Sequence, residues 1–173
     1  MKRFFITTLL LVLLRLSGAQ VYLTGDSISD FSATNVRSHS DFELNKVKEE
    51  LVVLVFISNN CPFVEQYLPR IKKLDSIYTD VQFVFINTYS KSHLNENKHH
   101  MITFLKRHQL KNVYLKSHNH ELIKLFGVEK APEVYLLTKT DGFFHLSYKG
   151  AIDDNPQSAE DVHNDYLKNA IDL

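Results

Sequence analysis

The one cysteine of the chain, Cys61, is the residue best placed to do chemistry. It ends a short turn and precedes Pro62, a residue favoured at the first position of a helix. The unpaired N–H groups and the positive dipole end of that helix would face the sulfur and favour the thiolate over the thiol. Glu65, one turn further on, acts modestly in the opposite sense. A thiolate in this position is a nucleophile toward disulfides or peroxides.

A single cysteine cannot form a disulfide within its own chain, so its role depends on other molecules. In an exported protein, an unpaired cysteine indicates a reactive thiol or an intermolecular bond, and a bond through Cys61 would give a covalent dimer. The alternative is a buried cysteine that packs as a small apolar residue.

Histidines and acidic residues provide weaker candidates. The nine histidines include His99-His100 and His118-Asn119-His120. Adjacent helical positions point about 100° apart, and neither group has a cysteine or carboxylate at a metal-binding spacing. We therefore expect exposed polar side chains there, and neither a metal site nor a cofactor. Asp153 and Asp154 are expected in a turn or a helix cap.

The elements around Cys61 are a buried strand and an amphipathic helix. Leu51–Ile57 is a continuous aliphatic and β-branched run, typical of a strand covered on both faces. Residues 58–60 form a turn, and the helix that follows contains Pro69, which should kink it. Its apolar positions are Phe63, Val64, Tyr67, Leu68, Ile71, Leu74, Ile77 and Tyr78, with Glu65, Arg70, Lys72 and Lys73 on the other side.

The rest of the chain predicts further strands and helices in alternation, and then a hairpin. The expected elements are a strand at 82–87, a loop at 88–98, a helix from 101 to near 108, a strand at 113–115, a helix at 121–126 closed by Gly127, paired strands at 133–138 and 143–148, and a final helix. Ser158-Ala159-Glu160-Asp161 resembles a capping box for that last helix, with Val162, Tyr166, Leu167 and Ile171 on its core face. This order predicts a mixed sheet with helices on both faces.

The residues around Cys61 resemble the thioredoxin superfamily. The strand, the turn and Cys61-Pro62-Phe63-Val64 are similar to that family's strand, C-x-x-C motif and helix, and Pro69 matches its helix-kinking proline. The resemblance implies a three-layer α/β/α sandwich with a mixed central sheet and a catalytic role for Cys61. It also implies that Asn60 and Pro62 lie beside the substrate, and it places Val64 at the resolving position.

A second segment supports the same resemblance. Residues 127–137, which include Ala131-Pro132, resemble the family's loop with a cis-proline before its hairpin. By that resemblance the Ala131–Pro132 bond is cis and both residues lie beside the cysteine, where substrate backbone docks. The alternative is an ordinary trans proline that opens a strand.

The resemblance is to the exported bacterial redoxins, a branch described as TlpA-like or AhpC-TSA-like. Residues 88–120 are similar to an insertion of that branch between the active-site half and the cis-proline hairpin. Residues 26–36 resemble its "DFS" opening, and residues 148–155 resemble the tail of members with N-x-C-P in place of C-x-x-C.

Several positions depart from the family pattern. Val64 replaces the resolving cysteine, Asn60 replaces a tryptophan, and Val55 replaces the buried acid of thioredoxins. Ser58 fits the serine or threonine three residues before a peroxiredoxin cysteine, but Leu54 stands where those enzymes have proline. The chain therefore cannot form an active-site disulfide alone.

Residues 1–19 are typical of a signal peptide, with basic residues first, an apolar stretch too short to span a bilayer and a small-x-small cleavage site. An N-terminal membrane anchor is the alternative. We expect residues 20–173 to form one redoxin domain that is periplasmic or secreted and meets the membrane only during export. Twenty basic residues balance twenty acidic ones, without long runs of either sign, which argues against nucleic acid as the main partner.

Two functions fit these observations. The first is an extracytoplasmic thiol–disulfide oxidoreductase or thiol peroxidase, whose partners are protein or small-molecule thiols and disulfides, or a peroxide, with an external reductant supplying the resolving thiol. The second is a redox-inactive binding or scaffold protein that has lost the resolving cysteine.

Overall fold

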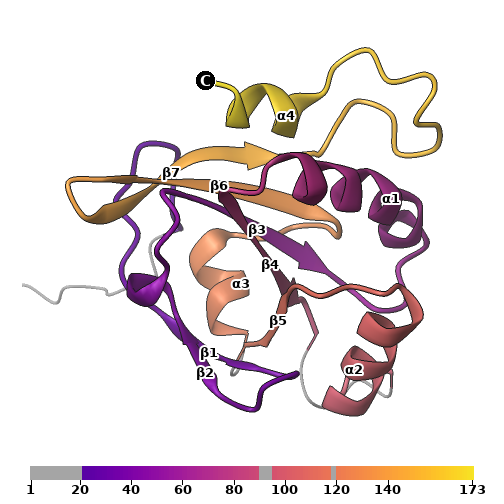
Figure 1. The fold of residues 1–173 in the computed structure, drawn as a ribbon, viewed down its shortest axis with the longest axis horizontal. Coiled ribbons are helices and arrows are strands. Elements are labelled where there is room, and N and C mark those ends of the chain that lie inside the picture. The colour runs from indigo at the N-terminus through magenta and orange to yellow at the C-terminus, as the bar shows by residue number, and fades with distance from the viewer. Residues whose placement is uncertain (1–20, 90–94, 118–119) are drawn as a thin grey trace, which may run out of the picture.

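The computed structural model describes residues 21–89, 95–117 and 120–173. The expected signal peptide, part of the loop after Thr88, and His118 lie outside these residues. The described chain forms one seven-stranded mixed sheet with helices on both faces (Figure 1), which confirms the predicted fold class.

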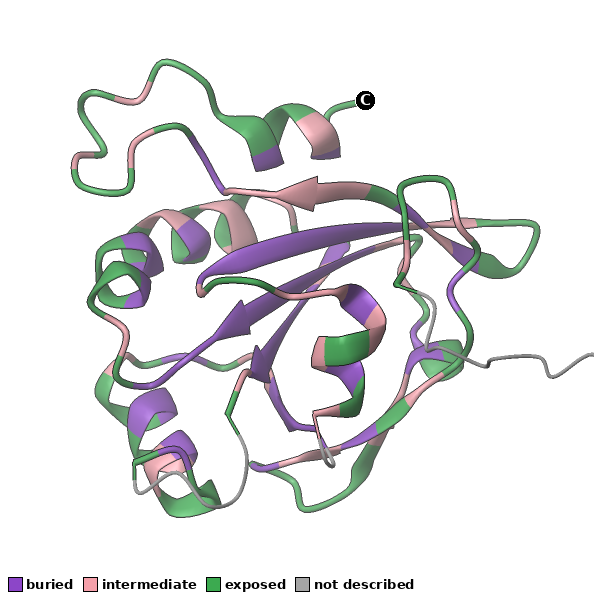
Figure 2. Cartoon of the chain, turned by 180° about the vertical axis from the view of Figure 1, so that it is seen from behind, coloured by how far each residue is buried: buried purple, intermediate pink, exposed green. Residues whose placement is uncertain are grey.

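The sheet has the strand order β2-β1-β5-β4-β3-β6-β7. Its strands are β1 (Ser32–Asn35), β2 (Asp41–Glu43), β3 (Leu51–Ile57), β4 (Val81–Asn87), β5 (Val113–Lys116), β6 (Glu133–Thr140) and β7 (Phe143–Gly150). β3 pairs in parallel with β4, and β4 with β5, whereas the other pairs are antiparallel. The central strands are buried along most of their length (Figure 2), as the aliphatic run of β3 predicts.

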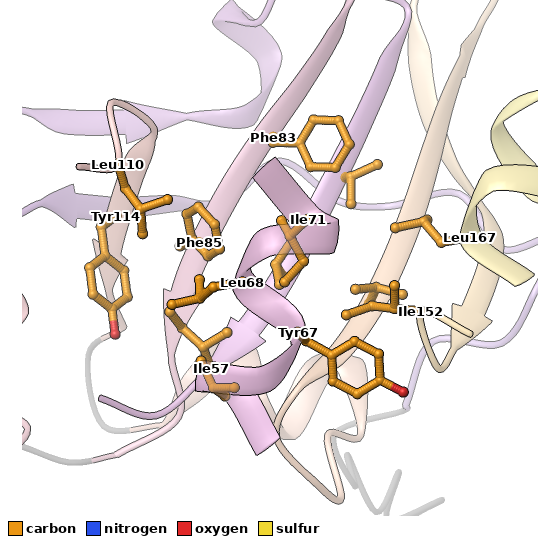
Figure 3. Close-up of a cluster of buried hydrophobic side chains, with 14 of the residues drawn as sticks. Ile57, Tyr67, Leu68, Ile71, Phe83, Phe85, Leu110, Tyr114, Ile152 and Leu167 are labelled. Carbon is orange, nitrogen blue, oxygen red and sulfur yellow. The ribbon is translucent and has the colours of Figure 1, made fainter. Parts of the chain in front are cut away.

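The helices are divided unequally between the two faces. They are α1 (Pro62–Ile77), α2 (Lys98–Arg107), α3 (Glu121–Phe126) and α4 (Tyr166–Ile171), with a 3-10 turn, η1, at Leu44–Lys46. Buried residues of α1, α2 and α4 belong to one hydrophobic cluster, and those of α3 belong to the other. The first cluster contains Leu68 and Ile71 of α1, which lie toward Phe85 and Phe83 of β4, and Tyr67, which lies toward Ile152 (Figure 3).

The second cluster is built around Phe126 of α3. Its ring centroid lies 5.7 Å from that of Phe56 on β3 and 5.2 Å from that of Tyr135 on β6. Phe56, Phe126 and Tyr135 are each fully buried, so α3 is held to the sheet chiefly by aromatic packing.

The helical pattern predicts more buried residues on α1 than the structure shows. Phe63 and Ile77 are 47% and 56% exposed, because each lies at an end of the helix. Arg70, expected on the solvent side, is instead half-buried in an ion pair described below. Pro69 lies inside the helix, as predicted.

The predicted capping box is wrong. α4 begins only at Tyr166, and residues 158–161 form a turn in which Asp161 N–H donates to Ser158 Oγ at 3.3 Å. Asp154 accepts from His163 N–H at 3.0 Å, which holds the preceding segment as a loop. Tyr166 is 42% exposed, although Leu167 is buried as expected.

The β6–β7 hairpin is tighter than the sequence suggests. β6 and β7 extend to Thr140 and Phe143, so its turn contains two residues, Asp141 and Gly142. Their φ values of 53° and 85° are the pair that a type I′ turn requires, which explains the Asp-Gly sequence.

The segment that precedes β1 lies along the outer edge of β7. Gly25 N–H donates to Leu146 O at 2.8 Å, and Ile28 N–H donates to Phe144 O at 2.7 Å. An isolated bridge pairs Ser27 with His145.

Candidate active site

Cys61 caps the N-terminus of α1, at the end of the turn that leaves β3. Its φ of −84° and ψ of 118° are extended, and Pro62 begins the helix, as predicted. Cys61 N–H donates to Ser58 O and Glu65 N–H donates to Cys61 O, both at 3.3 Å. The half-buried thiol is therefore carried by backbone that is fixed on both sides.

The thiol lies against the loop before β6. Cys61 Sγ is 3.1 Å from the carbonyl oxygen of Ala131, to which the thiol donates. The Ala131–Pro132 bond is cis, which confirms that prediction, and Pro132 is buried.

Two cavities flank the Ala131–Pro132 loop. The first, about 520 Å³, is lined by Asn60, Cys61, Pro62 and Ala131 among others, so most of the predicted site residues lie together. Pro132 instead lines a second cavity of about 530 Å³. That cavity is bordered by Phe63, Tyr67, Ala131, Ile152, Asp153 and Tyr166 and is largely apolar.

The positions where a thioredoxin carries its resolving cysteine and buried acid are both fully buried. Val64 and Val55 are 0% exposed and belong to the cluster beneath α1. Both are hydrocarbon side chains packed in the core, so neither position can resolve a mixed disulfide or relay a proton.

Sequence reasoning missed a buried carboxylate beside the cysteine. Glu96 is 1% exposed and lines the first cavity together with Cys61. Its Oε1 accepts from Ser58 Oγ at 2.6 Å, and its Oε2 accepts from Asn59 N–H at 3.1 Å and Asn87 Nδ2 at 2.7 Å. Glu96 lies in a polar stretch that predicts a loop, and no local pattern marks it as a site residue.

The polar network continues below Glu96. Tyr114 donates to Asn59 Oδ1 at 2.9 Å and accepts from Asn87 Nδ2 at 3.0 Å. Burial raises the pKa of Tyr114, so its hydroxyl stays protonated. Lys116 Nζ donates to the backbone oxygen of Glu96 at 2.6 Å. The turn before Cys61 is thus tied to β4, β5 and the segment before α2.

Glu65, expected to disfavour a thiolate at Cys61, is paired with the guanidinium of Arg107 near the end of α2 and lies beside the His108 ring. Arg107 Nη2 lies 2.6 Å from Glu65 Oε1, and His108 Nε2 lies 3.2 Å from it. The positive charge of Arg107 offsets the carboxylate and weakens its effect on Cys61.

A buried ion pair lies beside the apolar cavity. Arg70 Nη1 is 2.5 Å from Asp153 Oδ2, and Tyr67 donates to Asp153 Oδ1 at 3.0 Å. Burial and the nearby Asp153 charge raise the pKa of Tyr67 to about 12. Asp153 also accepts from Asn155 N–H at 3.0 Å, so the expected turn is present, whereas no local sequence pattern predicts the Arg70 pair.

Among the described residues, no group of three or more histidine, cysteine, aspartate or glutamate side chains could hold a metal ion. His99 and His100 have ring centroids 5.7 Å apart. The described part of the chain also has no helix long and apolar enough to cross a membrane.

This strand order, with Cys61 at the start of α1 and a cis-proline loop beside it, defines a thioredoxin-like fold. The sequence matches the Redoxin family over residues 23–163, and the chain belongs to that family.

Solved structures resemble the fold over most of its length. An uncharacterized conserved protein from Geobacillus kaustophilus has 24% identity and a TM-score of 0.78, over 88% of this chain and 82% of the other. A hypothetical protein from Sinorhizobium meliloti 1021 has 25% identity and a TM-score of 0.76, over 88% and 84%. A secreted disulfide oxidoreductase of Mycobacterium tuberculosis has 18% identity and a TM-score of 0.59, over 82% and 94%. No curated protein matches the sequence significantly.

Proposed function

We propose that the protein is an extracytoplasmic thiol-dependent oxidoreductase that exchanges disulfides through Cys61. The observation that carries this proposal is the position of Cys61 Sγ, at the N-terminus of α1 and 3.1 Å from Ala131 O beside a cavity. The N-terminus of a helix favours negative charge in general, and the cavity gives a second sulfur access to Cys61. Membership of the Redoxin family supports a redox role.

The exchange takes place in two steps. The Cys61 thiolate attacks one sulfur of a substrate disulfide, the S–S bond breaks, and the other sulfur leaves as a thiolate that takes up a proton from water. Cys61 is then held in a mixed disulfide. Because Val64 replaces a resolving cysteine, a thiolate from a small molecule or a partner protein attacks the mixed disulfide and releases the Cys61 thiolate.

The substrate-binding residues are those beside the sulfur. Asn60, Pro62 and Ala131 line the cavity into which Cys61 opens, and Pro132 borders the apolar cavity next to it. An extended substrate chain lies across the Ala131–Pro132 loop, with an apolar side chain in the second cavity. No cofactor is required for this chemistry.

The N-terminal sequence supports export, because residues 1–19 have the pattern of a signal peptide. The similarity of fold to a secreted disulfide oxidoreductase agrees with that location. An oxidising compartment would supply disulfide substrates.

The first test measures how the rate of Cys61 alkylation in the mature protein depends on pH, with and without prior treatment with hydrogen peroxide. The second test measures the reaction of Cys61 with a small aromatic disulfide. We expect fast alkylation well below about pH 8, together with a mixed disulfide that an added thiol releases. Cys61→Ser supplies the blank for every reaction.

A Cys61 that alkylates slowly until about pH 8.5 and forms no mixed disulfide would overturn the proposal. That result would favour the second candidate, a redox-inactive binding protein, for which the exposed Phe63 and Tyr166 at the apolar cavity would be the contact residues.

A further inference from the structure

We propose that Glu96 determines the substrate class of the site. By accepting the hydroxyl proton of Ser58, Glu96 withholds a hydrogen-bond donor from the cavity and so directs Cys61 toward disulfides rather than peroxides. Glu96 is a positioning residue in this scheme, because it acts through Ser58. The inference rests on the proposed function, since it presumes that Cys61 is reactive.

The hydrogen bonds of Ser58 are fully assigned. A serine hydroxyl has one proton to donate and two lone pairs that accept. Its proton goes to Glu96 Oε1 at 2.6 Å, and its oxygen accepts from Asn60 N–H at 3.3 Å. Ser58 is 5% exposed, so water does not compete for the proton. The hydroxyl therefore presents no donor to the cavity that it lines with Cys61.

The polarity of this hydrogen bond follows from the charge on Glu96. Both carboxylate oxygens receive donors, from Ser58 on one side and from Asn59 N–H and Asn87 Nδ2 on the other. A backbone N–H can only donate, so the second oxygen is always an acceptor. A carboxylate has no proton to give, so the Ser58 hydroxyl is the donor of this bond.

Peroxides and disulfides differ in what their leaving groups need. When the Cys61 thiolate attacks hydrogen peroxide, an S–O bond forms, the O–O bond breaks, Cys61 becomes a sulfenic acid and hydroxide departs with the electron pair. Hydroxide is strongly basic, since the pKa of water is about 15.7, and its departure is aided by a positioned donor that supplies a proton. A thiolate leaving group, with a thiol pKa of about 8.5, needs no such donor.

Other hydroxyl and amide donors of the cavity do not replace Ser58. Thr88 Oγ1 also lines it but donates to Ile57 O at 3.2 Å. Asn60, Tyr89 and Lys130 also line the cavity but are exposed, so their donors lie in contact with water rather than fixed toward the sulfur.

Glu96→Gln should reverse the hydrogen bond without changing the shape of the site. The amide oxygen of the new side chain must face Asn59 N–H, which can only donate. Its NH2 group then faces Ser58 and donates to the second lone pair of the hydroxyl oxygen. The Ser58 proton becomes free to point into the cavity.

The experiment measures two second-order rate constants for Cys61, with hydrogen peroxide and with a small aromatic disulfide, and compares their ratio across variants. In Glu96→Gln we expect the peroxide-to-disulfide ratio to rise on the order of tenfold, and in Ser58→Ala/Glu96→Gln to return to the native value. Glu50→Gln, which removes an exposed carboxylate outside the site, should leave the ratio unchanged.

Ser58→Ala in the otherwise native chain gives a second, independent test. If the Ser58 hydroxyl already donates its hydrogen bond to Glu96, removing that hydroxyl should leave the rate of reaction with peroxide at its native value. A clear fall in that rate, or an unchanged ratio in a folded Glu96→Gln protein that still exchanges disulfides, would overturn the inference alone. A native protein that reacts with neither reagent would overturn the proposed function as well.

Discussion

Arg70 Nη1 lies 2.5 Å from Asp153 Oδ2 and joins α1 to the segment that follows β7. The two side chains are 14% and 2% exposed, so the pair is screened little by water. Arg70 also donates to Asn155 O at 2.7 Å, and Tyr67 donates to the same aspartate. These bonds fix the border of the apolar cavity on which Tyr67 and Asp153 both lie.

Asp153→Ala should lower the free energy of unfolding by about 3 kcal/mol, because it leaves the Arg70 guanidinium buried without its counter-charge. Urea denaturation at neutral pH measures the change. Glu43→Gln breaks the exposed Lys46–Glu43 pair and should have no measurable effect. An equal decrease in the free energy of unfolding in the two variants would show that burial does not make the Arg70–Asp153 pair more important for stability than an exposed pair.

Phe63→Ala should weaken the binding of polypeptide substrates without slowing small ones. The ring is 47% exposed at the border of the apolar cavity, so a substrate side chain would bury it. Loss of that contact should raise the KM for a peptide with a leucine-flanked disulfide by roughly tenfold. Steady-state kinetics measures it, with Ile77→Ala, at the exposed end of the same helix, as the control. A parallel loss with a small aromatic disulfide would instead place Phe63 in the chemical step.

Stability should fall as the pH drops below about 6.5, in part through His108. Burial, followed by the positive charges of Arg107 and Lys72, lowers the pKa of His108 against the opposing effect of Glu65. Arg107 Nε donates to His108 Nε2 at 3.0 Å, which requires the neutral ring. Below the unfolded-state pKa of about 6.5, the unfolded chain binds a proton that the folded chain resists, so unfolding becomes easier down to the folded-state pKa.

His108→Gln should remove that part of the pH dependence. Urea denaturation of both proteins between about pH 5 and pH 8 gives their free energies of unfolding. As the pH falls, that free energy should decrease more in the native protein than in the variant. A stability difference that is constant across this range would contradict the assigned direction of the pKa shift.

Phe126→Ala should be among the most damaging single substitutions. The ring is fully buried between Tyr22, Phe56 and Tyr135, so its removal leaves a cavity that costs about 3–5 kcal/mol. Phe143→Ala makes the same chemical change at a side chain that is 66% exposed and should cost less than about 0.5 kcal/mol. Thermal unfolding followed by circular dichroism distinguishes the two. Similar melting temperatures would mean that the aromatic cluster can close around the missing ring.

The local parts of the fold could be predicted from the sequence. β3 has the predicted bounds Leu51–Ile57, because a continuous aliphatic run has few alternatives to a buried strand. Cys61 and Pro62 mark the start of α1 by residue type alone. The cis bond at Ala131–Pro132 followed from family resemblance and not from residue properties.

The parts that were missed depend on distant partners. β1 and β2 are polar and very short, and they are strands only because β5 offers an edge to pair with. The Arg70–Asp153 pair links residues 83 positions apart. Glu96 reaches Ser58 across 38 positions, from a stretch that has the composition of a loop. No short-range pattern contains this information.

The backbone pairing of residues 25–28 along β7 has a consequence for how copies of the protein meet one another. An uncovered β7, eight residues long, would offer N–H and C=O groups to a strand from another molecule and invite aggregation. The bonds from Gly25 and Ile28 occupy part of that edge. At the opposite edge, β2 has only three residues and begins at the exposed Asp41, and a short edge strand that carries charge resists pairing with another strand. Both edges of the sheet therefore oppose pairing with a strand from another molecule.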